Sequence, residues 1–141
     1  MLRAVFLLSL LNERKLRKMK IKPLAHEFSV CKLKDLSEAD WSGEYCFAAK
    51  TDDELSWVCT SNTAPKTCIA REDGWKAFRI EGLLDFSLIG ILSRISDLMA
   101  KNGIGIFAVS TYNTDYVLVK SENYEKAIAV LEKDGYEIVR R

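Results

Sequence analysis

The sequence predicts an α+β protein in which two modules follow one another, each an antiparallel sheet with helices on one face. Apolar residues at 88, 91, 92, 95, 98 and 99 recur at helical spacing and predict a long helix. Short apolar runs separated by polar turns predict strands on both sides of it. A length of 141 residues, 48% of them hydrophobic, suits one domain or two small ones that depend on each other.

The first half of the chain is expected to contain three strands, at residues 26–33, 45–49 and 55–59. A polar turn at 51–54 joins the second and third strands, because aspartate favours tight turns. Residues 35–43 are long enough for only a short helix or a helical turn. A further helix is expected to begin at Pro65, since proline is favoured at the first helical position, and to end at Gly74.

The second half predicts a complete β-α-β-β-α-β order, which is the ferredoxin-like arrangement. We expect strands at 75–81, 104–109, 116–120 and 136–139, and helices at 86–101 and from Ser121 to Gly135. Asp85 or Ser87 is expected to cap the first helix, and Asn102-Gly103 to end it.

The two halves also contain similar residues at corresponding positions. Phe47-Ala48 followed by Thr51-Asp52 resembles Phe107-Ala108 followed by Thr114-Asp115, which indicates an internal repeat. We therefore predict a degenerate module at residues 22–74 and a complete module at 75–141.

Residues 1–21 are interpreted as an N-terminal extension, of which 1–18 precede a more ordinary start at Met19. The apolar run at 4–11 is shorter than a bilayer span, and the basic run at 12–20 follows it rather than preceding it as in a secretory signal. Stable membrane insertion is therefore not expected. An alternative interpretation is a basic amphipathic helix that touches an anionic membrane.

Composition excludes several functions. The net charge of +1 argues against a nucleic-acid surface. Cys31, Cys46, Cys59 and Cys68 form no CxxC pair, so we expect buried free thiols rather than a metal site or a disulfide framework. His26 has no evident catalytic partner, and the acidic residues 52–54 are interpreted as a turn in preference to a cation site. No catalytic motif or cofactor motif is found, so an enzyme is not expected.

Two polar segments are candidates for binding a small molecule. The helix start near Asp85 and Ser87 leaves backbone amides that can bind a carboxylate, although simple capping explains these residues as well. Asp115, in the second segment, can accept a hydrogen bond from an ammonium group. Together these groups suit an amino acid. Tyr112 and Tyr116 are as readily explained by packing.

Two longer motifs then indicate a family. The segments Leu83-Leu84-Asp85-Phe86-Ser87-Leu88-Ile89-Gly90-Ile91-Leu92 and Ile106-Phe107-Ala108-Val109-Ser110-Thr111-Tyr112-Asn113-Thr114-Asp115-Tyr116-Val117-Leu118-Val119 resemble the signature of tandem ACT-domain proteins of the CASTOR type. Segments 28–33 and 51–56 are similar to the bacterial members. The resemblance covers residues 22–141 and implies two ferredoxin-like ACT modules with an amino acid bound between modules.

The resemblance also implies roles for single residues. The turn at 110–115 contacts the ligand, and the loop at 83–87 closes over it, which assigns ligand contacts to Asp85, Phe86, Ser87, Ser110, Thr111, Tyr112 and Asp115. In the first half only a remnant of this turn is kept, in Lys50-Thr51-Asp52. The expected protein is a cytoplasmic, homodimeric amino-acid sensor. The alternatives are a ligand-free ACT-like interaction or dimerisation module, and an enzyme or RNA-binding domain on the same scaffold.

Overall fold

The computed structural model of the chain describes residues 3–7, 10, 19–82 and 90–140. Residues 3–7 and 10 are helical and exposed. The chain divides into two compact units: unit 1 comprises 1–24 and 78–141, and unit 2 comprises 25–77. Strands β1 (Lys20–Lys32) and β4 (Ala70–Glu81) each contribute residues to both units. The fold is α+β with largely antiparallel strand pairing.

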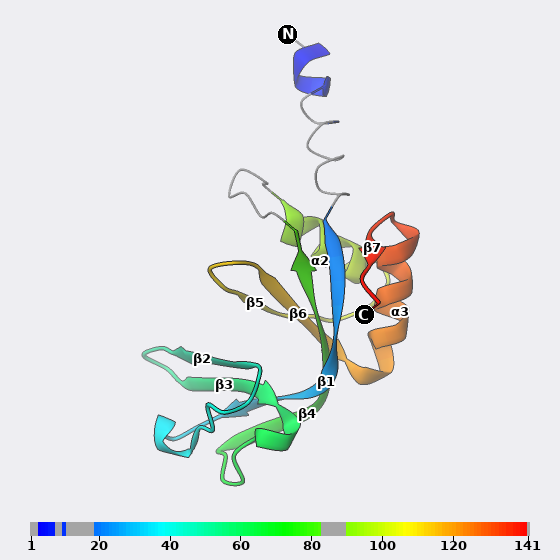
Figure 1. Cartoon of the computed structure of the whole chain (residues 1–141). Coiled ribbons are helices and arrows are strands. Elements are labelled where there is room, and N and C mark those ends of the chain that lie inside the picture. Colours follow the sequence, from blue (N-terminus) through cyan, green and yellow to red (C-terminus); the bar gives the residue numbers. More distant parts are fainter. Residues whose placement is uncertain (1–2, 8–9, 11–18, 83–89, 141) are drawn as a thin grey trace. The chain divides into compact units, whose positions relative to one another are not determined.

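Unit 1 contains the second half of the chain together with the start of β1 (Figure 1). From β4 onward the elements are α2 (Ile91–Lys101), β5 (Phe107–Ser110), β6 (Asp115–Lys120), α3 (Ser121–Lys133) and β7 (Glu137–Ile138). Antiparallel β5 and β6 pair Phe107 with Leu118 and Ser110 with Asp115. The short β7 runs parallel to β1, with Ile21 opposite Ile138.

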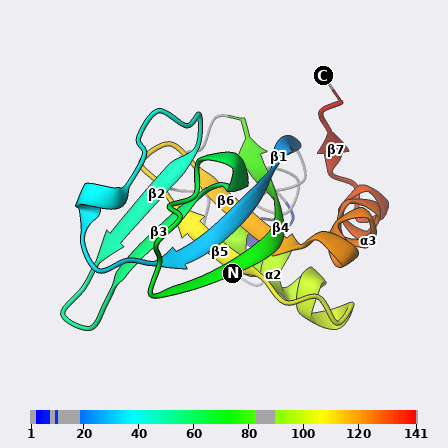
Figure 2. The same ribbon diagram turned by 90° about the horizontal axis from the view of Figure 1, so that it is seen from below.

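Unit 2 contains the remaining strands and two single-turn 3₁₀ helices. Figure 2 shows its strands β2 and β3 side by side. Its elements after β1 are η1 (Leu36–Glu38), β2 (Cys46–Lys50), β3 (Leu55–Thr60) and η2 (Ser61–Thr63). β3 pairs antiparallel with both β2 and the end of β1. Along the whole chain, hydrogen bonding orders the strands β2-β3-β1-β4-β6-β5, and β7 lies beside β1.

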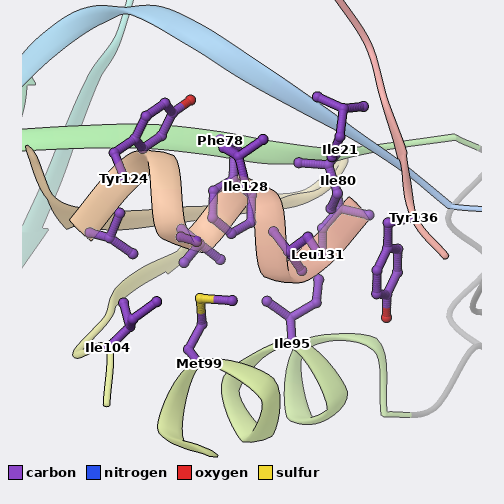
Figure 3. Close-up of a cluster of buried hydrophobic side chains, with 14 of the residues drawn as sticks. Ile21, Phe78, Ile80, Ile95, Met99, Ile104, Tyr124, Ile128, Leu131 and Tyr136 are labelled. Carbon is purple, nitrogen blue, oxygen red and sulfur yellow. The ribbon is translucent and has the colours of Figure 1, made fainter. Parts of the chain in front are cut away.

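The core of unit 1 forms where β1, β4 and β6 meet the apolar faces of α2 and α3 (Figure 3). Ile95 and Met99 lie one turn apart on α2, and both are fully buried. On α3 the buried residues keep the same helical spacing, which satisfies the burial pattern of an amphipathic helix. The buried residues of α3 are Tyr124, Ala127, Ile128 and Leu131.

Glycines end both helices as the sequence predicts. Gly103 and Gly135 have positive φ angles of 69° and 103°. The amide of Ile104 then donates to the Met99 carbonyl at 2.9 Å, and that of Tyr136 to the Leu131 carbonyl at 3.1 Å. These bonds satisfy carbonyls that would otherwise lack partners at each helix end.

Several predicted boundaries are wrong. The first strand begins at Lys20, so Met19 and Ile21, which we expected within the N-terminal extension, are buried in the core of unit 1. The predicted helix from Pro65 to Gly74 does not form, because residues 70–74 already belong to β4. Helix α2 begins at Ile91, directly after Gly90, which has a left-handed φ of 92°. The predicted start at 86 lies outside the described residues. The module boundaries at 22–74 and 75–141 stay a prediction.

Replacing Leu131 with alanine tests the core of unit 1. The side chain is fully buried, so the free energy of unfolding should fall by about 2–5 kcal/mol. Urea denaturation followed by circular dichroism measures the change. Ala129→Ser, at an exposed position of the same helix, is the control and should change stability by less than about 0.5 kcal/mol. A loss at Leu131 as small as the control's would contradict this core.

The pH dependence of stability tests the burial of Tyr124. Burial raises the pKa of its phenol to about 12, whereas an unfolded tyrosine titrates near pH ~10. The folded state therefore holds the proton more tightly, and this stabilisation is complete below pH ~10 and is lost as the pH rises through about 12. Over that window the unfolding free energy should fall more steeply in the native chain than in Tyr124→Phe; equal slopes would contradict the assignment.

Candidate functional site

The β5–β6 turn is closed by one side chain. The Thr111 hydroxyl donates to the Thr114 carbonyl at 2.9 Å and accepts from the Thr114 amide at 3.3 Å. The Thr111 amide donates to the same carbonyl at 2.8 Å. Because a threonine hydroxyl here replaces a backbone partner, the four-residue turn has a defined shape. The residues on either side of it, Ser110 and Asp115, are therefore held opposite each other.

The carboxylate of Asp115 lies at the base of this turn, and one of its two oxygens accepts a hydrogen bond. The Ser110 hydroxyl donates to Oδ1 of Asp115 at 2.6 Å in an exposed setting, although Asp115 as a whole residue is half-buried. Within the described part of the chain, no group donates to the second oxygen, Oδ2. A carboxylate oriented in this way can accept a charge-assisted hydrogen bond from a cationic group. Tyr112, at the tip of the turn, is 88% exposed and is not part of the core of unit 1.

A further hydrogen bond fixes the turn to the end of β4. The Thr114 hydroxyl donates to the Ile80 carbonyl at 2.5 Å in a partly buried setting. The turn is therefore held beside the point where the chain leaves β4 and enters the 83–89 segment. Asp85, Phe86 and Ser87, the other predicted site residues, lie outside the described residues. The structure thus brings Ser110, Thr111 and Asp115 together and leaves the three loop residues untested.

Unit 2 contains a turn built in the same way. The Thr51 hydroxyl accepts from the amides of Asp53 and Glu54 at 3.1 and 3.0 Å, and the Thr51 amide donates to the Glu54 carbonyl at 2.9 Å. Strand register places each residue of this hairpin sixty positions before its counterpart, so Phe47 matches Phe107 and Thr51 matches Thr111. The proposed match of Thr51-Asp52 with Thr114-Asp115 was therefore wrong by three residues.

The two turns differ in chemistry. The position of Ser110 is held in unit 2 by Lys50, and that of Asp115 by Leu55. The turn of unit 2 therefore has an aliphatic side chain where the turn of unit 1 has a carboxylate. By register, Lys50-Thr51-Asp52 corresponds to Ser110-Thr111-Tyr112, and only the threonine is the same residue in both.

Unit 2 also contains a cavity of about 480 Å³ beside this turn. Aliphatic side chains and charged groups of both signs line it: Lys32, Leu33, Lys34, Asp35, Leu36, Lys50, Thr51, Asp52, Asp53, Glu54, Leu55 and Ile69. The hydroxyl of Ser37, together with its amide, donates to Asp35 and lowers the pKa of that carboxyl. In the parts of the chain that are described, no group of three or more His, Cys, Asp or Glu residues is arranged to hold a metal.

Sequence reasoning missed this cavity, although one signal pointed to it. Asp35-Leu36-Ser37 is similar to Asp85-Phe86-Ser87, fifty residues later, and differs from it in the middle residue. Each triplet follows a strand that contributes to both units, and each unit has a threonine-closed turn.

His26 has no part in either site. It lies within β1, and its Nε2 is 3.1 Å from Oε2 of Glu44, at hydrogen-bond distance on the surface. Its ring also stands 5.8 Å from that of Tyr45. This arrangement suits a surface contact of unit 2 and gives the histidine a partner that the sequence did not indicate.

Comparisons with known proteins give a family model and a solved structure with more than 30% identity. The profile of the ACT domain matches residues 70–133. A crystal structure of protein Atu0741 from Agobacterium tumefaciens is 32% identical, covers 86% of this chain and 92% of its own, and has a TM-score of 0.75. None of the curated proteins matches the chain.

More distant structures share the fold. A protein of unknown function from Vibrio cholerae, described as a possible transport protein, is 16% identical, with coverage of 85% and 92% and a TM-score of 0.64. The regulatory subunit of aspartate kinase from Thermus thermophilus, in its ligand-free form, is 10% identical, with coverage of 80% and 95% and a TM-score of 0.60. Within the described residues, no helix is long and apolar enough to cross a membrane.

Replacing Thr114 with valine tests what holds the turn. The change removes the donor to the Ile80 carbonyl and keeps the shape of the side chain, so stability should fall by about 1–3 kcal/mol because a partly buried acceptor loses its partner. Thr114→Ser keeps the hydroxyl and should retain most of the stability. Urea unfolding curves of the three proteins compare them. If valine and serine behaved alike, the hydrogen bond would not be what anchors the turn.

Proposed function

Since the chain belongs to the ACT-domain family, we propose that it is a regulatory protein that binds an amino acid at the β5–β6 turn of unit 1. The observation that carries the proposal is the Asp115 carboxylate, which is oriented by Ser110 and has an oxygen without a donor in the described part of the chain. An α-ammonium group would donate to this oxygen. The Ile80–Thr114 bond keeps the turn beside the exit of β4.

The carboxylate of the ligand would be bound by the segment that comes after β4. Asp85, Phe86 and Ser87 belong to that segment, and backbone amides there are the proposed donors. Thr111 shapes the turn through its two hydrogen bonds to Thr114, and Tyr112, which is exposed at the tip, would pack against the bound ligand. Each of the seven predicted site residues thus has a role in binding or in shaping the site.

A regulatory, non-catalytic role is supported by the kind of protein that shares the fold. The similar Thermus thermophilus structure is a regulatory subunit of aspartate kinase. We propose likewise that this chain senses a metabolite and passes the signal on as a cytoplasmic homodimer. The matching hairpins of units 1 and 2 support two ferredoxin-like ACT modules in tandem, with the first degenerate, as in the CASTOR type.

Thermal-shift measurements against the twenty amino acids test binding. A specific ligand should raise the melting temperature with concentration, because it stabilises only the folded chain. If none of the twenty shifts it, the ligand-free interaction module becomes the better reading, and the chain should then still form a dimer in sedimentation experiments. A chain that is monomeric and also binds none of them would contradict both functions.

Asp115→Asn tests the site itself. The amide keeps the size of the side chain and an oxygen for Ser110 but removes the charge, so affinity for the identified amino acid should fall about 10- to 100-fold. Isothermal titration calorimetry measures the change. Glu54→Gln, in the corresponding turn of unit 2, is the matched control and should bind normally. Equal affinity of Asp115→Asn and the native chain would remove Asp115 from the site.

A further inference from the structure

All four cysteines of the chain lie in unit 2, around one small core. Cys31 and Cys59 are buried in that core beside Trp57, and Cys46 and Cys68 are partly exposed and pack against it. The sequence predicts free thiols, which the structure confirms, but only two of the four are buried. The cluster has no part in the proposed amino-acid site, which lies in unit 1.

Strand register brings two of these cysteines opposite each other. Cys46 of β2 lies directly opposite Cys59 of β3. The neighbouring pair is hydrogen-bonded, because the Thr60 amide donates to the Tyr45 carbonyl. Bonded and non-bonded pairs alternate in antiparallel strands, so Cys46 and Cys59 form a non-bonded pair, where Cα atoms stand about 4.5 Å apart and side chains are closest. A disulfide requires a Cα separation of about 4.4–6.8 Å.

Other pairings are less favourable. Cys31 lies opposite Trp57, so Cys59 is its diagonal neighbour, about 7–8 Å away and beyond disulfide reach. Cys68 contacts Cys31, but its thiol donates to the Pro65 carbonyl at 3.1 Å. Burial raises the pKa of both Cys31 and Cys59, so the choice between pairings rests on strand register and not on thiol acidity.

We propose that Cys46 and Cys59 are a modification site, joined by a reversible disulfide when the chain meets a two-electron oxidant such as hydrogen peroxide. The more exposed Cys46 reacts first: its sulfur attacks a peroxide oxygen, the O–O bond breaks, one water leaves, and a sulfenic acid forms. The Cys59 sulfur then attacks the Cys46 sulfur, and the displaced hydroxide leaves as water with the Cys59 proton. Two thiols are oxidised and one peroxide is reduced to two waters.

The disulfide would link β2 to β3 at the end of the hairpin away from its turn. Residues 51–54 form the turn at the other end of this hairpin and border the cavity of unit 2. Oxidation would therefore hold one wall of the cavity more rigidly. The proposal does not depend on the amino-acid site, since no residue of unit 1 takes part.

Peptide mapping of the full-length chain tests the pairing. Trypsin cleaves after Lys50 and separates the four cysteines onto peptides 21–32, 35–50, 51–66 and 67–71. After treatment with hydrogen peroxide and blocking of the remaining thiols, mass spectrometry should show 35–50 joined to 51–66. The number of titratable thiols should fall from four to two and return to four with dithiothreitol.

Variants separate this pair from the others. The double variant Cys31→Ser, Cys68→Ser should still form the bond, and Cys46→Ser should lose it and keep its remaining thiols. If Cys46→Ser does not fold, the peptide map of the native chain is sufficient by itself to show whether Cys46 and Cys59 are joined. Recovery of 21–32 joined to 67–71, of disulfide-linked dimers, or of four free thiols at oxidant concentrations that oxidise a model dithiol would overturn the proposal.

Discussion

A threonine hydroxyl closes each of the two hairpin turns, and the placement of the side chains around both turns depends on it. Thr111 in unit 1 and Thr51 in unit 2 make bonds that a backbone group would otherwise have to supply. Because the turn is fixed, the residues on either side of it face each other across the hairpin. The same side-chain hydroxyl thus places Ser110 opposite Asp115 in unit 1, and Lys50 opposite Leu55 in unit 2.

The two units differ most in the element that comes after the hairpin. After β6, the chain forms the helix α3 from Ser121 to Lys133, which covers the core of unit 1. Sixty residues earlier, Ser61 begins only the single turn η2, and Ala70 already lies in β4. Unit 2 therefore lacks the second helix and has a smaller core, formed around Trp57 and the thiols. This difference supports the proposal of one complete module and one degenerate module.

Helical periodicity and glycine positions predicted much of unit 1, because both signals are local. The apolar spacing located α2 and α3, and Gly103 and Gly135 marked where they end. The first part of β1 was missed, since Lys22 and Pro23 interrupt its apolar pattern although Ile21 and Leu24 are buried in the core. The exposed residues 70–73 of β4 carry no apolar pattern at all, and Pro65 suggested a helix instead.

The candidate site also has features that the sequence predicts and features that it does not. The turn at 110–115 was predicted from its own residues, and the structure adds the Thr114–Ile80 bond, which joins positions 34 residues apart and has no local signature. The cavity of unit 2 depends on three separate segments, around Lys32, Lys50 and Ile69, so no single stretch of sequence indicates it. Helix α2 begins directly after Gly90, whose left-handed backbone angle periodicity does not report.

Backbone amide NMR of the full-length chain, titrated with pools of the twenty amino acids, tests the central claim most directly, because each amide reports its own surroundings. Binding at the proposed site should shift the amides of 110–115 and of 80–90 in proportion to occupancy and leave those of β2 and β3 in place. Shifts confined to unit 2, or none in the presence of any pool, would contradict an amino-acid site at the β5–β6 turn.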